Sequence, residues 1–333
     1  MEKVLSLIIP TYNMEKYLNK CLDSLIVENM NLLEVLIIND GSKDNSSNIA
    51  HVYENKYPNT FRVIDKENGN YGSCINRGIK EAKGKYIKVL DADDSFNSKN
   101  LHLFLENIKN IDVDLILSDY VIVNESDEET RLGTYALPTN KIMKFEESIS
   151  KIANNMQMHS VTYLRENILK IEYQQTEGIS YTDQEWIFIP AITAYKVIYY
   201  KIPLYRYLVG RTGQTMDISV MNKSFSNFMK VLQSLHDNYI HYEQDDIRKK
   251  YLYNRIYSYL SYIYAITFIS GQNTNSLFIE IDEFIKMNNS SIYKDLEKLK
   301  ISRLIPFKYV KYWHKTKKSI PAIINFIYNF FYK

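Results

Sequence analysis

Three carboxylates lie within four consecutive positions of this chain, at Asp91, Asp93 and Asp94. They follow the apolar run 86–90, which is typical of a buried strand. Side chains two positions apart on an extended chain point the same way, so Asp91 and Asp93 can converge on one target. Facing carboxylates repel each other unless a cation lies between them, and a hard divalent ion that grips a diphosphate fits such a site. The alternative is a solvated acidic turn that caps the next helix.

The segments around this acidic turn alternate between strand and helix patterns, as in a parallel sheet. Apolar, β-branched runs predict strands at 4–9, 34–39, 61–64 and 86–90. Helical stripes are predicted at 15–27, 44–57, 71–82 and 101–108, an extended segment at 115–123, and a hairpin at 125–139. Right-handed crossovers bring the loops after these strands to one edge, where ligands bind in open α/β sheets.

The loop after the first strand carries Pro10, Thr11, Tyr12 and Asn13, with Glu15 one turn into the next helix. It offers a hydroxyl, an aromatic face for a base, and an amide. Taken alone, such a loop is also an ordinary strand-to-helix turn.

The loops after the second and third strands carry further candidates. Asp40, close to Ser42, can accept a hydrogen bond from a ring N–H or a ribose hydroxyl. An Asx turn with a helix cap is the alternative for this loop. The glycines of 67–72 permit close approach of the backbone to a ligand.

Arg206 and Arg211 lie on a glycine-bearing segment, 205–215. Guanidinium groups pair with phosphate oxygens in a fork geometry, so this segment could close over a diphosphate. Solvation of one arginine at the surface is the alternative. His159 and Ser160 are candidates to face an acceptor, on position alone.

Composition limits the class of protein. The chain has 333 residues, 45% of them hydrophobic and 24% charged, so it can build a large core with room for two parts. Its formal charge is only +2, which gives no field for binding nucleic acid. Cys21 and Cys74 form no metal or redox spacing, which suits reduced thiols in a cytosol. The apolar run 4–9 is too short for a signal peptide or a membrane span, so we expect a cytoplasmic protein.

The sequence after Met221 reads as almost all helix. The aromatic run 251–269 is too polar to span a bilayer and is interpreted as a core helix. Basic residues crowd 303–318, and the apolar run 320–332 follows. A helix there would suit the inner membrane interface beside anionic headgroups, or it docks on the helical region or on a second copy of the chain.

The motifs, taken in order, resemble those of the family 2 glycosyltransferases. The matching segments are 9–15, 38–44, 68–78, 90–94 and 177–186. The resemblance implies an α/β GT-A fold, which is a Rossmann-like, mostly parallel sheet with flanking helices. It places a nucleotide-binding half at 1–120, an acceptor half at 121–215 and a helical C-terminal region at 216–333.

The resemblance also implies the reaction. A hexosyl- or hexosaminyltransferase that depends on Mg²⁺ or Mn²⁺ would move a sugar, with inversion, from a nucleoside diphosphate sugar, most often a UDP-sugar. The acceptor would be a hydroxyl of a bacterial cell-surface glycan or of a lipid-linked precursor. By resemblance Asp40 recognises the base, Asp91 contacts the ribose or the metal, and Asp93 coordinates the metal. The nucleotide-sugar-binding residues on this interpretation are Pro10, Thr11, Tyr12, Asn13, Glu15, Asp40, Ser42, Asn68, Asn76, Asp91, Ala92, Arg206 and Arg211.

Asp183 fills the position of the catalytic base by resemblance. In an inverting displacement a carboxylate must stand near the attacking hydroxyl and take its proton. Glu185 is its nearest rival, and Asp183 also makes a sensible acid or cap in a first helical turn. The chain departs from the family at Thr182, where Glu is frequent, and at Ile75, where Arg is frequent.

Two other classes remain at this stage. A sugar nucleotidyltransferase would need a glycine-rich, basic loop after the first strand, where this chain has 10–13. A non-catalytic protein that binds nucleotide sugars would share most site residues, but Asp183 together with the Asp91 and Asp93 pair speaks against it. Homo-oligomer formation is left open by the sequence.

Overall fold

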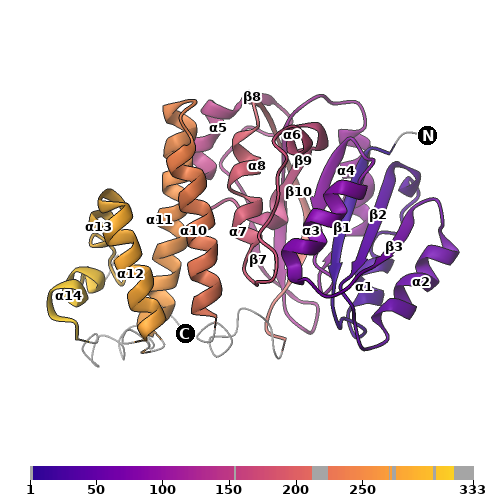
Figure 1. Cartoon of the computed structure of the whole chain (residues 1–333). Coiled ribbons are helices and arrows are strands. Elements are labelled where there is room, and N and C mark those ends of the chain that lie inside the picture. Colours follow the sequence, from indigo (N-terminus) through magenta and orange to yellow (C-terminus); the bar gives the residue numbers. More distant parts are fainter. Residues whose placement is uncertain are drawn as a thin grey trace. The chain divides into compact units, whose positions relative to one another are not determined.

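A computed structural model of the chain describes residues 3–153, 155–211, 224–269, 271, 275–302 and 305–318. The chain divides into two compact units, Met1–Thr212 and Gly213–Lys333 (Figure 1). The predicted membrane-surface helix at 320–332 lies outside the described residues.

The nucleotide-binding half that the sequence predicts is built on four parallel strands. They are β1 (Leu5–Thr11), β2 (Leu33–Asn39), β3 (Phe61–Asp65) and β4 (Tyr86–Val89). In register, Thr11 pairs with Asn39, and Asn39 pairs with Asp65. The carboxyl ends of these strands are therefore level, as the alternating pattern predicts, and their loops share one edge.

Helices flank these strands. They are α1 (Leu18–Asp23), η1 (Met30–Leu32), α2 (Ser46–Lys56), α3 (Asn70–Glu81) and α4 (Ser98–Ile108). The first helix starts later than predicted because residues before it bond to the loop after β2: Asn13 N–H donates to Ser42 Oγ at 3.1 Å, and Asn45 N–H donates to Glu15 Oε2 at 2.9 Å. Gly78 lets α3 lie against β1, since a Cβ there would meet Ile8 at 2.5 Å.

The rest of the first unit adds mixed strands and short helices. The strands are β5 (Ser95–Phe96), β6 (Leu115–Val123), β7 (Glu129–Gly133), β8 (Ile142–Lys144), β9 (Val161–Leu164) and β10 (Lys196–Leu208). The helices are α5 (Phe145–Ile152), η2 (Met158–Ser160), α6 (Arg165–Lys170), α7 (Asp183–Trp186) and α8 (Ile189–Ile192). The pairing of β6 with β7 is antiparallel and confirms the predicted hairpin.

All these strands join one sheet in the order β3-β2-β1-β4-β9-β6-β10-β5, with β7 beside β6 and β8 beside β10. β9 is inserted between β4 and β6 and runs antiparallel to both. This insertion was not predicted, and it brings the segment just before β9 next to the end of β4. The mixed, mostly parallel sheet with flanking helices confirms the predicted fold class.

The core of the first unit fills the space between this sheet and its helices. Strands β1 and β2 are buried along almost their whole length, as expected of strands covered on both faces. Cys21 and Cys74 are both buried and carry no disulfide. The interior is therefore a continuous apolar support for the edge that carries the acidic turn.

The second unit is helical, which confirms the predicted C-terminal region. Its helices are α10 (Phe225–His241), α11 (Asp246–Ile269), α12 (Ser276–Asn288), α13 (Ser290–Leu296) and α14 (Tyr309–Thr316). Aromatic side chains dominate its core, with Trp313 packed on Phe278 at 5.3 Å between ring centroids. His314 bonds to both Asp282 and Glu297 and so ties α14 to the rest of the unit. Among the described helices none combines the length and the apolar character that crossing a membrane requires.

Candidate active site

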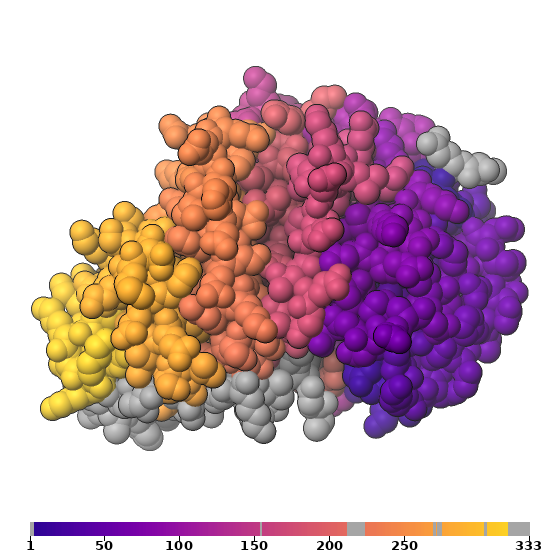
Figure 2. Space-filling model, viewed as in Figure 1, coloured from indigo at the N-terminus to yellow at the C-terminus, as the bar shows by residue number. Residues whose placement is uncertain are grey.

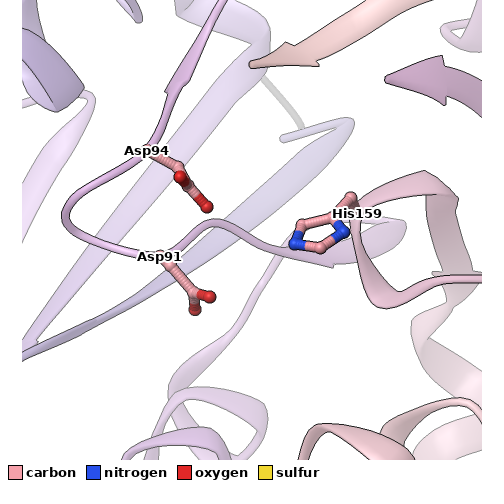
Figure 3. A group of neighbouring side chains, drawn as sticks. All are labelled: Asp91, Asp94 and His159. Atoms are coloured by element: carbon pink, nitrogen blue, oxygen red, sulfur yellow. The ribbon is translucent and has the colours of Figure 1, made fainter. Parts of the chain in front are cut away.

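The acidic turn follows β4 at the shared edge of the sheet. The chain bends there, since Asp94 N–H donates to Asp91 O at 3.0 Å. Asp94 points toward the same space as Asp91 (Figure 3), and the charge of Asp93 also acts on Asp91. The predicted convergence of Asp91 and Asp93 stays a prediction. Ligand atoms of Asp91, Asp94 and His159 all lie within 4.8 Å of one another.

Residues of other elements donate hydrogen bonds to both Asp91 and Asp94. Asp91 Oδ1 accepts from the Tyr71 hydroxyl of α3 at 2.8 Å. Asp94 accepts from the Tyr205 hydroxyl at 2.6 Å and from Leu208 N–H at 2.7 Å, both on β10. These donors fix the carboxyl groups in place while leaving lone pairs on each.

Asp93 has a different partner. Its Oδ2 accepts from Arg211 Nε at 2.6 Å, and both side chains are mostly buried. The Arg211 guanidinium also lies 5.5 Å from the centre of the Tyr17 ring. The assignment of Asp93 as a metal ligand stays a prediction.

His159 lies beside the carboxyl pair because η2 precedes the inserted strand β9. Its ring stacks on Tyr207 with centroids 4.2 Å apart and meets the edge of Tyr205 at 4.7 Å. Nδ1 is buried and has no hydrogen-bond partner among the residues that the structure describes. Burial and the charge of Lys88 lower the pKa of His159 to about 3, so the imidazole is neutral.

Lys88 on β4 is fully buried below the site. Its ammonium donates to His159 O at 2.7 Å and to Val161 O at 3.1 Å, so it ties β4 to the start of β9. Burial lowers the pKa of Lys88 to about 7. The amine of Lys88 therefore titrates near neutral pH. The apolar pattern of the strand did not predict such a group.

The pKa values of both carboxyl groups, Asp91 and Asp94, are raised. Burial, and then the charges of Asp93 and Asp183, raise the pKa of Asp91 to about 7. Burial and the neighbouring carboxylates also raise the pKa of Asp94. Charges of one sign held this close favour a bound cation or protons. The Asp91, Asp94 and His159 group is therefore compatible with a divalent metal ion.

Asp183 comes to this site from the part of the chain that the sequence predicts to be an acceptor half. It is the first residue of α7, and its charge helps to raise the pKa of Asp91, Tyr71 and Tyr207. Gln184 Nε2 donates to Asp183 Oδ2 at 3.0 Å. Asp183 thus lies within electrostatic reach of the acidic turn.

Glu185, the alternative candidate for the base, already has hydrogen-bond partners. Its Oε1 accepts from Thr176 Oγ1 and its Oε2 from Thr176 N–H, each at 2.7 Å, and the residue is buried. Thr182, where the family often has Glu, is also buried and accepts from Gln175 Nε2 at 2.9 Å. These bonds shape the segment that delivers Asp183.

The loops after β1 and β2 hold each other together. Asn13 Oδ1 accepts from Lys43 N–H at 2.7 Å, besides the bonds of Asn13 and Glu15 given above. Pro10 and Thr11 end β1, and Thr11 is buried. Tyr12 is 45% exposed, so its ring is accessible to a base.

Asp40 is buried and already has partners. Its Oδ1 accepts from Lys66 Nζ at 2.5 Å and from Gly69 N–H at 2.9 Å. Asn68 Nδ2 donates to Asp40 O at 2.9 Å, so the structure brings these two predicted residues together. Sequence reasoning missed Lys66, whose only signal was a basic residue two positions before Asn68.

Three predicted ligand residues make structural contacts. Asn76 exchanges hydrogen bonds with the backbone of Gln175 and donates to Glu177 at 2.8 Å. Arg206 pairs with Asp127 at 3.0 Å and with Glu129 at 2.5 Å, on the hairpin of β6 and β7. Ala92 is buried. Their assignment to the nucleotide sugar stays a prediction.

The contact of α3 with 175–177 is close. A Cβ at Gly72 would lie 2.0 Å from Thr176 O. The two segments lie side by side on the face of the first unit shown in Figure 2. An open cavity of about 1030 Å³ is lined by the outer side of α3, the end of α6 and residues 172–177.

Tyr71, Tyr205 and Tyr207 were not singled out by sequence reasoning, although they surround the carboxyl pair. Tyr71 stands inside a matching motif, and its place there was the one available signal. Tyr205 and Tyr207 lie in the segment that was read as a phosphate-closing loop but forms the end of β10. Strand β10 was not predicted, although its β-branched and aromatic residues are the ordinary signal of a strand.

Comparison with known proteins agrees with this fold. Residues 6–163 match the model of glycosyl transferase family 2. The glycosyltransferase GlyG of Streptococcus pneumoniae serotype 4 is 31% identical over 128 residues, which cover 38% of this chain and 42% of GlyG. The chain spans 41% to 60% of the first curated relatives that it matches.

Two solved structures share the fold. TarS 1–349 of S. aureus, crystallised with UDP-GlcNAc, matches over 95% of this chain and 92% of that chain, with a TM-score of 0.70 and 17% identity. The mannosyltransferase PcManGT of Pyrobaculum calidifontis, in complex with GDP-Man and Mn²⁺, matches over 89% and 83%, with a TM-score of 0.55 and 12% identity. Residues 6–163 therefore belong to glycosyl transferase family 2, and the solved structures share the fold over nearly the whole chain.

Proposed function

We propose that this glycosyltransferase moves a sugar from a UDP-sugar to a hydroxyl of a cell-surface glycan or of a lipid-linked acceptor, with inversion. One observation carries the proposal. Asp183, in the predicted acceptor half, lies within electrostatic reach of Asp91 in the predicted nucleotide-binding half. Donor-binding and proton-accepting groups are thereby combined in one site, as a transfer reaction requires.

On this proposal Asp183 takes the proton of the acceptor hydroxyl as the new bond forms. Glu185 is a weaker candidate because both of its oxygens bond to Thr176. Tyr12 offers its exposed ring to the base, and Asp40 contacts the base from the loop after β2. Arg211 would move from Asp93 to the departing diphosphate, where a guanidinium stabilises developing charge.

A divalent cation fits the negative charge of this edge. Asp91 and Asp93 remain our candidates for the ligands that join it to the diphosphate. When bound, such a cation would act as a Lewis acid on the phosphate oxygens. PcManGT was solved with Mn²⁺ and TarS with UDP-GlcNAc, so Mn²⁺ and UDP-sugars are the first ligands to test.

The lipid-linked acceptor is proposed from the sequence alone, which places basic residues at 303–318 before the apolar run 320–332. Such a tail would hold the enzyme at the cytoplasmic membrane surface. Co-sedimentation with vesicles of anionic lipid, compared with neutral vesicles, tests this part of the proposal.

A screen of sugar nucleotides tests the function as a whole. Melting temperature is measured with each UDP- and GDP-sugar, with Mn²⁺ and with a chelator. We expect one UDP-sugar to stabilise the protein and to release UDP slowly when the acceptor is absent. Stabilisation without any nucleotide release, with all acceptors tested, would favour a protein that only binds nucleotide sugars.

A further inference from the structure

The Asp91, Asp94 and His159 group has the features of a built site. Asp91 is partly exposed, whereas Asp94 and His159 are buried, so the group forms a pocket of ligand atoms that is open on one side. Figure 3 shows one edge of the imidazole facing the two carboxyl groups. Asp93 is not a member of this group, and it pairs with Arg211 instead.

The imidazole is the unexplained member of this group. His159 is 9% exposed, and its Nδ1 is buried without a hydrogen-bond partner in the described part of the chain. A buried polar group without a partner costs free energy, and so points to a missing ligand. The side chain is held toward the carboxyl groups by Tyr207 and Tyr205, which pack on its face and edge.

The two carboxyl groups are also held from behind. The Tyr71 hydroxyl orients Asp91, and the Tyr205 hydroxyl and Leu208 N–H orient Asp94. Outer hydrogen bonds of this kind set the direction of ligand atoms in metal sites. Two carboxylates and a neutral imidazole suit Mn²⁺, Co²⁺ or Zn²⁺ better than Mg²⁺ or Ca²⁺, which prefer oxygen alone.

We propose that Asp91, Asp94 and His159 bind a divalent transition-metal ion in the free enzyme, before the sugar nucleotide arrives, with a ring nitrogen of His159 as a direct ligand. Arg211 can stay on Asp93 while this ion is bound. The use of the ion in sugar transfer rests on the proposed function. Its binding does not. The enzyme would thus meet its donor already loaded with metal.

The test uses the full chain, freed of metal by chelation and without nucleotide. Mn²⁺ is added, and electron spin echo spectroscopy is used to look for coupling between Mn²⁺ and ¹⁴N. We expect such coupling in the wild-type protein, and calorimetry should show binding of Mn²⁺ tighter than that of Mg²⁺. This measurement needs no variant, so it does not depend on how a substitution folds.

His159→Gln then removes the nitrogen and keeps a polar side chain of similar reach. It should abolish the ¹⁴N coupling and weaken nucleotide-free Mn²⁺ binding by roughly tenfold or more, since even outer-shell changes cost this much. Asp93→Asn is the matched control, and it should leave the coupling in place. Circular dichroism checks that both variants are folded.

The outcomes separate this proposal from the proposed function. Binding of Mn²⁺ only together with UDP, or binding without ¹⁴N coupling, overturns the metal site and leaves sugar transfer standing. Coupling in the free protein together with failure of every sugar nucleotide to bind supports the metal site and rejects the proposed function. Loss of coupling in Asp93→Asn would show that Asp93 is needed for metal binding together with His159, and would overturn the proposed ligand set.

Discussion

Asp93 and Arg211, 118 residues apart in sequence, form a largely buried ion pair with 2.6 Å between Oδ2 and Nε. The pair joins the acidic turn after β4 to the residue just beyond the end of β10. It neutralises one carboxylate of the turn and holds a guanidinium beside the proposed diphosphate site. Arg211 therefore reduces the negative charge that Asp93 offers to a metal ion and is positioned to exchange one anion for another.

Arg211→Gln should change metal and nucleotide binding in opposite directions. Removing the guanidinium leaves Asp93 uncompensated, so nucleotide-free Mn²⁺ affinity should rise, by about tenfold for a neighbouring unit charge near the surface. UDP affinity in the presence of Mn²⁺ should fall, because the diphosphate loses its guanidinium. The control is Arg62→Gln, which removes the ion pair between Arg62 on β3 and Glu81 at the end of α3. Calorimetry measures both affinities, and a parallel fall of both would mean that Arg211 only supports the fold.

Asp183→Asn keeps the size of the side chain but removes the base. Turnover should fall by about 10²–10⁴-fold, while donor and metal affinities stay nearly unchanged. Nucleotide release and calorimetry on the same preparation measure these quantities. Turnover within threefold of wild type would reject Asp183 as the base, and an equal loss of donor affinity would show that it holds the nucleotide or the metal.

Glu185→Gln should behave differently. The carboxylate accepts from both Thr176 N–H and Thr176 Oγ1, and an amide can accept with only one oxygen. We expect a loss of about 1–3 kcal/mol in the free energy of unfolding, with turnover per folded molecule largely kept. Denaturant unfolding followed by circular dichroism measures the loss. Normal stability with abolished turnover would transfer the role of base to Glu185.

Lys88 should make stability depend on pH in the alkaline range. Its pKa is about 7 in the folded protein, against an ordinary value of 10.5. Between these values the unfolded chain binds more protons, so stability rises with pH. Relative to Lys88→Met, the wild type should gain roughly 2 kcal/mol in the free energy of unfolding between about pH 7 and pH 9.

Urea unfolding of both proteins at several pH values tests this expectation, and the difference between them cancels the titration of other groups. His159 and the Tyr205 ring face the side chain at position 88 in both proteins. Parallel pH profiles for the two proteins would show that Lys88 keeps an ordinary pKa.

Gly72→Ala should disturb the segment that delivers Asp183. The new Cβ would lie 2.0 Å from Thr176 O, so the backbone of 175–177 must move, at a cost of about 1–3 kcal/mol. Turnover should fall more than donor affinity, since Asp40 and its loop are untouched. Gly178→Ala is the control, because a Cβ there meets nothing within 4 Å and only the left-handed φ of +75° is strained. Similar kinetics in both variants would contradict this role for Gly72.

The sequence alone determined the parallel half of the sheet, the edge that carries the site and the family. Local patterns suffice for these, because apolar runs alternate with helical stripes and polar loops follow each run. Asp91, Asp40 and Tyr12 were placed at that edge by their positions directly after strands. Periodicity also predicted the hairpin of β6 and β7 and the helical C-terminal unit.

Only the tertiary structure decided which of these residues meet. The turn after β4 set Asp94 beside Asp91, and the insertion of β9 between β4 and β6 brought in His159 and the carbonyls that receive Lys88. The pairing of β10 with β6 carried Arg211 to Asp93 and Tyr205 to Asp94. The contacts made by His159, Lys88, Tyr205 and Arg211 join residues 65 to 118 positions apart, and their geometry depends on strand order and on a single backbone turn. Neither leaves a periodic signal in the sequence, because periodicity reports which face of an element is buried and not what lies against it.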